Sequence, residues 1–149
     1  MPEPMRIGLF GGFWVSVGTR SVPEGSWRLK KAASLVKLLA LAPGHRLHRE
    51  QVTEWLWADL APEAASNNLR QALYAARRAL EPNPAASRYL RVRDGWLALC
   101  PEGPLWVDAE AFEEAARTAR RAEDPAAYRA ALNLYAGELL PDDRYEAWA

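Results

Sequence analysis

The stretch N-N-L-R-Q-A-L-Y-A-A-R-R-A-L-E, residues 67–81, carries the pattern that decides the fold. Its apolar residues recur at the spacing of one helix face, which predicts an amphipathic helix. These apolar residues are Leu69, Leu73, Ala76 and Leu80. The positions between them hold polar and basic residues, namely Arg70, Gln71, Tyr74, Arg77 and Arg78. Such a side is either simply solvated or lies against an acidic partner, and the rest of the chain must decide between the two.

Two more helices are expected before this one. The first spans residues 27–42, where apolar residues repeat with the helical period until a Pro-Gly pair stops the helix. The second begins at His48, which is predicted to be the N-cap because Gln51 lies three positions later and completes a capping box. It runs to about Trp57, and a loop then leads to the helix over 67–81.

Short strands are expected before the three helices. Between residues 6 and 22 apolar residues alternate with others, and this alternation is typical of half-buried strands. A two-residue loop at Gly18-Thr19 would place Val15 opposite Val22. The pattern predicts a small antiparallel sheet at the N-terminus.

A second hairpin is expected after the helices, because Asp94-Gly95 is a strong two-residue turn signal. This loop predicts the cross-strand pairs 93–96, 92–97, 91–98 and 90–99. In that register one face is apolar, with Leu90, Val92, Leu97 and Leu99. Arg91 and Arg93 share the other face, and we expect them on the same side of the molecule as the arginines of helix 67–81.

The remaining part of the chain is predicted to be helical. Residues 101–104, Pro-Glu-Gly-Pro, are expected to form a linker. Two antiparallel helices should follow, the first capped by Asp108 and the second by Asp124, which Pro125 follows at the first helical position. Each has one apolar side, which a lone pair can hardly bury, so the pair either docks on the preceding domain or belongs to something longer.

Charge is distributed unevenly along the chain. Residues 1–100 hold 14 Lys/Arg and 8 Asp/Glu, whereas residues 101–149 hold 5 and 11. The first part is thus basic by six charges and the second is acidic by six. This asymmetry suggests a basic part that meets a polyanion, although two solvated surfaces of opposite sign would give the same numbers.

Several classes of protein do not fit the sequence. No apolar run is long enough to cross a bilayer, the N-terminus lacks the pattern of a signal peptide, and Cys100 is the only cysteine. We therefore expect a cytoplasmic protein that does not bind a membrane. The glycines precede no helix, the serines have no nucleophile-elbow context, and His45, His48 and Cys100 do not make a usual zinc site. No catalytic residue, metal site or cofactor is predicted.

The order of elements predicts an α+β fold, with a winged helix-turn-helix domain over residues 1–100 and a helical pair over 105–149. In a winged helix the third helix enters the major groove of DNA, and the hairpin, or wing, touches an adjacent groove or the backbone. Arginine matches guanine and Asn or Gln matches adenine. Charge alone suits phosphate, which is the role expected of Arg77, Arg78, Lys30 and Lys31.

Each feature also has an ordinary explanation. Arginines opposite a leucine stripe are usually solvated, Arg91 and Arg93 can be edge-strand charges that deter aggregation, and Asn67-Asn68 often means a helix cap or a turn. Only the combination of the three, in this order along the chain, favours DNA binding.

Five motifs extend this interpretation. Three lie in the first part: W-R-L-K-K-A at 27–32, L-A-L-A-P-G-H-R-L-H-R-E-Q at 39–51 and N-N-L-R-Q-A-L at 67–73. Two lie in the second: W-V-D-A-E-A-F at 106–112 and Y-A-G-E-L-L-P-D-D-R-Y-E-A-W at 135–148. Together they are specific, and over nearly the whole chain they resemble the SARP-type bacterial transcriptional activators.

The resemblance implies an OmpR-type winged helix followed by a truncated, N-terminal part of a tetratricopeptide-like bacterial transcriptional activation domain (BTAD). It implies a transcription activator that binds direct repeats in promoter DNA, as a side-by-side homodimer, and recruits RNA polymerase holoenzyme. Carried over by position, the recognition-helix candidates are Asn68, Arg70, Gln71, Tyr74, Arg77 and Arg78, and those of the wing are Arg91 and Arg93.

A rival hypothesis is a protein-interaction module, in which the winged helix and the acidic helical pair dock a protein partner. The opposed charges also suggest autoinhibition, in which the acidic part folds back and shields the basic face. Deletion of residues 105–149 should then tighten DNA binding.

Overall fold

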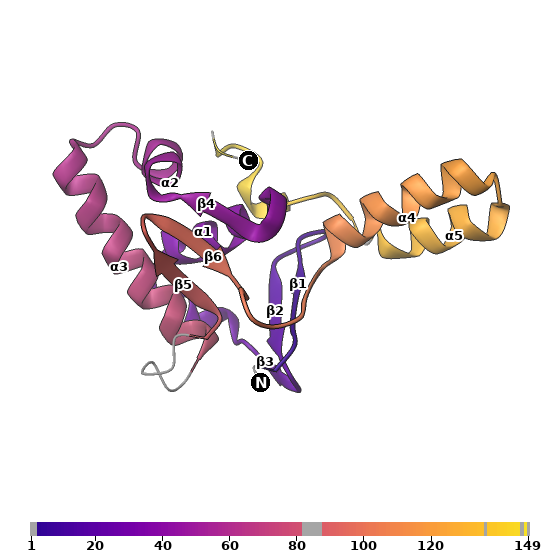
Figure 1. Ribbon diagram of the computed structural model, residues 1–149, viewed down its shortest axis with the longest axis horizontal. Helices are drawn as coiled ribbons and strands as arrows, with labels where there is room; N and C mark the ends of the chain where they lie inside the picture. Colours follow the sequence, from indigo (N-terminus) through magenta and orange to yellow (C-terminus); the bar gives the residue numbers. More distant parts are fainter. Residues whose placement is uncertain (1–2, 82–87, 136, 147, 149) are drawn as a thin grey trace.

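The computed structural model of the protein describes residues 3–81, 88–135, 137–146 and 148. This part of the chain forms an α+β body with five α-helices and two small sheets. Figure 1 shows α3 at one end of the molecule, the two sheets in the middle, and α4 and α5 projecting as a pair at the other end.

The first sheet has the strand order β3-β2-β1-β7. It consists of β1 (Met5–Gly8), β2 (Trp14–Val17), β3 (Arg20–Ser21) and β7 (Leu105–Val107). The first three strands are antiparallel, and the N–H of Val22 donates to the carbonyl of Val15 at 2.9 Å, as the predicted turn requires. The predicted N-terminal hairpin is therefore confirmed.

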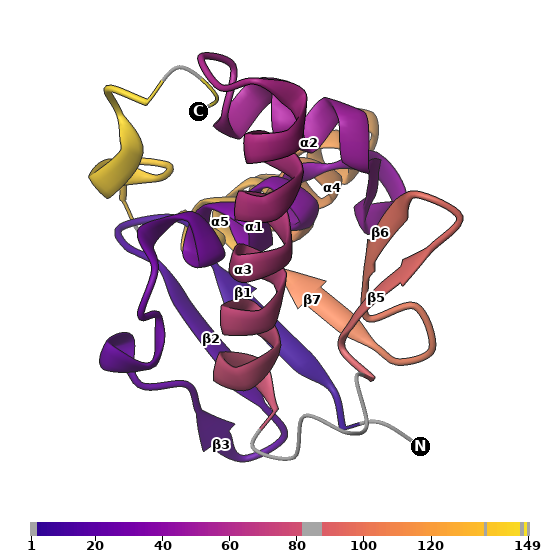
Figure 2. The same cartoon turned by 90° about the vertical axis from the view of Figure 1, so that its left-hand side faces the viewer.

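The three predicted helices are α1 (Lys30–Leu41), α2 (Arg49–Leu56) and α3 (Pro62–Leu80). Every residue of α1 from 32 to 40 is buried, so α1 is the centre of the core, and α3 packs against it (Figure 2). The expected capping box of α2 is present, with His48 as N-cap and Gln51 as its partner.

Two helix starts differ from the prediction. A 3-10 turn, η1 (Glu24–Ser26), precedes α1, and residues 27–29, which were expected to open that helix, lie outside it. α3 starts at Pro62, ahead of the quoted stretch, because proline has no N–H to leave unpaired and its fixed φ suits the first helical position.

The second sheet has the order β4-β6-β5, with β4 (Arg46–His48), β5 (Leu90–Arg93) and β6 (Trp96–Leu99). The register of β5 and β6 is the predicted one at all four pairs. Asp94 and Gly95 have φ values of 53° and 81°, the left-handed conformation that a type I′ hairpin turn needs. The pairing of β4 with β6 was not predicted, because the sequence gives no signal for a partner so far along the chain.

The last two helices are α4 (Asp108–Ala122) and α5 (Pro125–Leu134), which lie side by side. Asp124 caps α5 as predicted, since its side chain accepts a hydrogen bond from the N–H of Ala126. The prediction for Asp108 was wrong. Its buried carboxylate makes no cap of α4 and instead accepts hydrogen bonds from the N–H groups of Leu9 and Phe10, at 2.8–3.1 Å.

After α5 the chain returns to the N-terminal body. The N–H of Leu140 donates to the carbonyl of Leu9 at 2.8 Å, and the N–H of Gly11 donates to the carbonyl of Glu138 at 2.7 Å. Beyond this point Asp143 forms a 2.5 Å ion pair with Lys37 of α1, and the side chains of both are almost completely buried. Residues 138–143 thus fasten the C-terminal part to the sheet and to α1.

The division into domains at residues 100 and 105 stays a prediction. β7, which was expected to open the second domain, pairs in parallel with β1 of the first sheet. Within the described ranges no helix has the length and apolar composition needed to span a membrane.

Candidate functional site

The outward face of α3 carries a continuous polar stripe. It consists of Asn67, Arg70, Gln71, Tyr74 and Arg78, all of which are exposed to solvent. The inward face buries the apolar residues of the same helix, including Leu69, Ala72, Leu73 and Ala76. The helical period separates the two sets, and the predicted orientation of the helix is therefore confirmed.

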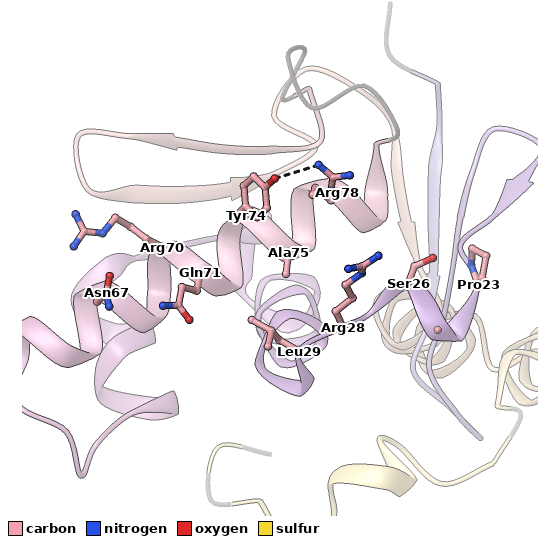
Figure 3. A pocket seen from close by; sticks show the side chains of 11 residues that line it. Pro23, Ser26, Arg28, Leu29, Asn67, Arg70, Gln71, Tyr74, Ala75 and Arg78 are labelled. Atoms are coloured by element: carbon pink, nitrogen blue, oxygen red, sulfur yellow. Dashed lines mark hydrogen bonds between the residues drawn. The ribbon is translucent and has the colours of Figure 1, made fainter.

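The stripe forms one wall of a groove of about 900 Å³, which we call the α3 groove. Its other wall is the segment 23–29 that leads into α1, as Figure 3 shows. Three arginines line the groove: Arg28 from that segment, and Arg70 and Arg78 from α3. Among the described residues no Asp or Glu belongs to its lining, which is Pro23, Gly25, Ser26, Arg28, Leu29, Asn67, Arg70, Gln71, Tyr74, Ala75 and Arg78.

The arginines of the α3 groove have no acidic partner among the described residues. Arg78 donates to the hydroxyl of Tyr74 at 3.1 Å, and its guanidinium lies 5.7 Å from the centre of that ring. Arg70 extends into solvent from the middle of the helix (Figure 3). The groove therefore offers positive charge and several hydrogen-bond donors to an anionic ligand.

Two predicted recognition residues lie outside the groove. The Nε of Arg77 donates to the carbonyl of Leu90 at 3.1 Å and so connects α3 to β5. Asn68 is half-buried and does not line the groove. Both lie about a quarter turn or more from the centre of the stripe, since successive helix residues are about 100° apart. Asn67 lines the groove instead.

The hairpin of β5 and β6 lies beside α3, but its arginines face elsewhere. Val92 and Leu97 face the cleft between the hairpin and α3. Arg91 and Arg93 line a separate groove together with Trp96. This differs from the expectation that the arginines of helix and hairpin share one side. The reason is the two-residue period of a strand: once the apolar face turns to α3, the residues between must point away from it.

The two hairpin arginines differ in their contacts. Arg91 binds both carboxylate oxygens of Glu102, at 2.8 and 3.3 Å. This hydrogen bond raises the pKa of Arg91 and lowers the pKa of Glu102 from their ordinary values. Arg93 is exposed next to the turn and has no acidic partner among the described residues. Of the two, Arg93 is the one available to an external anion.

The predicted backbone contacts Lys30 and Lys31 have partners within the chain. The Nζ of Lys30 lies 2.6 Å from a carboxylate oxygen of Glu146, and this hydrogen bond raises the pKa of Lys30 and lowers that of Glu146. The Nζ of Lys31 donates to the carbonyl of Leu56 at 3.0 Å. Neither lysine lines the α3 groove.

Sequence reasoning missed Arg28 and Asn67. A cap or a turn was the ordinary explanation considered for Asn67, and it does not apply because α3 begins at Pro62. Arg28 lies in the motif W-R-L-K-K-A, but nothing in the sequence indicates that this segment runs beside α3. A helix wheel centred on Gln71 would have found Asn67, whereas Arg28 needed the tertiary structure.

Other reactive groups lie away from the groove. Burial raises the pKa of the Cys100 thiol to about 12, so this cysteine stays protonated and unreactive. Within the part of the chain that the structure describes, no three His, Cys, Asp or Glu side chains gather in a way that could hold a metal ion. The groups that the α3 groove presents are guanidinium, amide and hydroxyl, which suit recognition by hydrogen bonds.

Comparison with known proteins identifies a shared fold. No family model matches the sequence, and no curated protein matches it. Among solved structures, Mycobacterium tuberculosis EmbR, in a complex with a low-affinity phosphopeptide, is similar with a TM-score of 0.64 and 20% identity over 93% of this chain. The match covers 38% of the EmbR chain, so the protein spans well under half of that structure. This likeness shows that the two chains share an α+β fold.

Proposed function

We propose that the protein is a sequence-specific DNA-binding transcriptional regulator of the SARP type, with a binding rather than a catalytic role. In this proposal α1, α2 and α3 with the β5–β6 hairpin form a winged helix-turn-helix, and α3 is the recognition helix. The observation that carries the proposal is the exposed stripe of α3, where arginine, glutamine and asparagine side chains line a groove free of acidic residues.

The residue types of the stripe suit the major groove of duplex DNA. That groove is about 12 Å wide and admits one helix, whose side chains then reach the base edges. Arg70 and Gln71, in the first half of the stripe, are the proposed base readers, because their paired hydrogen-bonding groups match guanine and adenine. Arg78 is the proposed phosphate contact of the helix. Arg93, on the face of the hairpin that points away from α3, is the proposed backbone contact of the wing.

The remaining parts of the proposal come from the resemblance to the SARP-type activators. α4 and α5 would be the first helices of a tetratricopeptide-like activation domain. The protein would bind direct repeats in promoter DNA as a side-by-side dimer and contact RNA polymerase. Helices α4 and α5 project from the end of the molecule opposite α3, which leaves α3 accessible to DNA and the helical pair accessible to another protein (Figure 1).

A second candidate is the protein-interaction module, which the surface of α5 favours. Tyr128 and Leu132 of α5 are 44% and 64% exposed, although they repeat at helical spacing like a buried stripe. An apolar helix face left open in this way is typical of a surface that another protein or helix covers.

A selection from a random duplex library tests the proposal. We expect one enriched motif, with binding that weakens steeply as salt increases. Each neutralised phosphate contributes about −0.9 to the slope of the logarithm of the binding constant against the logarithm of the salt concentration, which we call the log–log slope. Gln71→Ala or Arg70→Ala should relax the preference at one base pair and cost about 1–3 kcal/mol there. Absence of any salt-sensitive duplex binding at low ionic strength would favour the interaction module instead.

A further inference from the structure

We propose that the segment 23–29 is a second flank of the DNA interface and that Arg28 contacts a backbone phosphate. This inference rests on the proposed function and adds to it a contact that lies outside both the recognition helix and the hairpin. It makes α3 the centre of a three-part surface, with the hairpin on one side and the segment 23–29 on the other.

The arrangement of charge in the α3 groove is the first argument. Arg28 and Arg78 reach the same end of the groove from opposite walls (Figure 3). Two positive charges that line the same end of a groove both attract an anion that enters it. Glu24 lies four residues before Arg28 but does not line the groove, so the described residues place no carboxylate there. A phosphate that bridges the two guanidinium groups would complete the site.

The second argument is that the segment is held in place before any ligand binds. The N–H of Ser26 donates to the carbonyl of Pro23 at 2.9 Å, and the N–H of Arg28 donates to the carbonyl of Ser26 at 3.1 Å. The ring of Trp27 packs against Phe13, with 5.4 Å between the ring centres. A backbone fixed in this way loses less entropy when Arg28 binds a ligand, so the contact is preorganised.

The length of the groove indicates an extended anion rather than a small one. Its helical wall runs from Asn67 to Arg78, which at a rise of 1.5 Å per residue is roughly 16 Å. One DNA strand carries a phosphate about every 3.4 Å along the duplex axis, so several phosphates pass along a wall of this length. A single small anion would occupy only the end where Arg28 and Arg78 meet.

The test uses the full chain and the duplex selected above. Arg28→Ala should weaken binding about three- to tenfold and flatten the log–log salt slope by about 0.9, as expected for one lost phosphate contact. Arg28→Lys should restore the slope, because charge is what the contact needs. The matched control is Arg129→Ala on α5, an exposed arginine at the other end of the molecule, which should bind like the wild type. Circular dichroism must show equal folding in all variants.

Duplexes with single uncharged methylphosphonate linkages locate the contact. One linkage should weaken wild-type binding and have no further effect on Arg28→Ala, because the same interaction has already been lost. If the wild type binds DNA and Arg28→Ala keeps its slope, the inference is wrong while the proposed function stands. If Arg28→Ala changes the preferred base without changing the slope, Arg28 reads a base and the phosphate contact is overturned. If the wild type binds no duplex, the proposed function fails and this inference falls with it.

Discussion

α1 and α3 both carry positive charge, but they use it differently. Lys37 and Lys30 of α1 form ion pairs with Asp143 and Glu146, and Lys31 donates to a main-chain carbonyl. The groove-lining arginines of α3 have no acidic partner within the described part of the chain. The charges of α1 therefore stabilise the protein itself, whereas those of the α3 groove remain available to a ligand.

The net charge of a region therefore does not by itself identify a binding surface. The first hundred residues are basic by six charges. Part of that excess is neutralised by acids from the second part of the chain, which reach back across the fold to α1. What distinguishes α3 is the absence of carboxylates in the lining of its groove.

Helices α4 and α5 do not cover α3 in this structure. In Figure 2 α3 lies nearest to the viewer, and α4 and α5 lie behind the body of the molecule. The autoinhibition hypothesis therefore gains no support from the arrangement. Deletion of residues 105–149 would also remove β7 and Asp143, and we expect it to unfold the protein rather than to expose a hidden surface.

The largest expected effect comes from breaking the buried ion pair of α1. Asp143→Ala leaves the ammonium of Lys37 buried without a counterion, which should lower the free energy of unfolding by about 3–5 kcal/mol. The neighbouring Asp142 is exposed, so Asp142→Ala is the matched control and should change little. Urea unfolding measures both. A loss below about 1 kcal/mol for Asp143→Ala would mean that Lys37 finds another partner.

Two adjacent arginines of α3 are expected to have different roles, Arg77 in stability and Arg78 in DNA binding. Arg77→Ala removes the hydrogen bond to Leu90 and should cost about 1–3 kcal/mol of stability, because it leaves a carbonyl of β5 without that partner. Arg78→Ala should leave stability nearly unchanged and flatten the salt slope of DNA binding by about 0.9. Thermal unfolding and a salt titration separate the two effects. The reverse assignment, with Arg77 controlling the slope, would place the DNA on the hairpin side of α3.

The smallest expected effect is the acid dependence of the exposed pair on α1. The pKa of Glu146 is lowered by its hydrogen bond with Lys30, so the pair stabilises the protein above the ordinary carboxyl pKa. That contribution is lost as the pH falls through the lowered pKa of Glu146. We expect Glu146→Gln to be slightly less stable than the wild type near pH 7 and equal to it at strongly acid pH. A difference that persists in acid would show that Glu146 acts through packing.

The sequence predicted several local features of this fold correctly. The Asp94-Gly95 turn fixed the hairpin register, and His48 with Gln51 fixed the start of α2, because each signal lies within a few residues of its effect. The outward face of α3 followed in the same way from the helical period.

Contacts between distant segments could not be predicted. Asp108 holds Leu9 from 99 positions away, and Asp143 meets Lys37 from 106 positions away. The periodicity of a sequence gives no signal for a contact between residues so far apart. Asp108 was therefore expected to cap a helix, and Lys30 was expected to be free to contact a phosphate. The position of Arg28 could not be predicted for the same reason, because it lines the α3 groove only through the packing of α1 against α3.

The central claim is that the arginines of α3 that have no acidic partner among the described residues bind DNA, whereas the lysines of α1 that have partners within the chain do not. One measurement tests it directly. The double variants Arg70→Ala/Arg78→Ala and Lys30→Ala/Lys31→Ala remove the same charge, and their affinity for the selected duplex is compared from low to high salt. We predict that the α3 variant loses most of its binding and about 0.9 of the log–log slope, because Arg70 is the proposed base reader and Arg78 the proposed phosphate contact, while the α1 variant stays close to the wild type. Equal losses in both variants would contradict the claim, because binding would then follow net charge rather than the α3 groove.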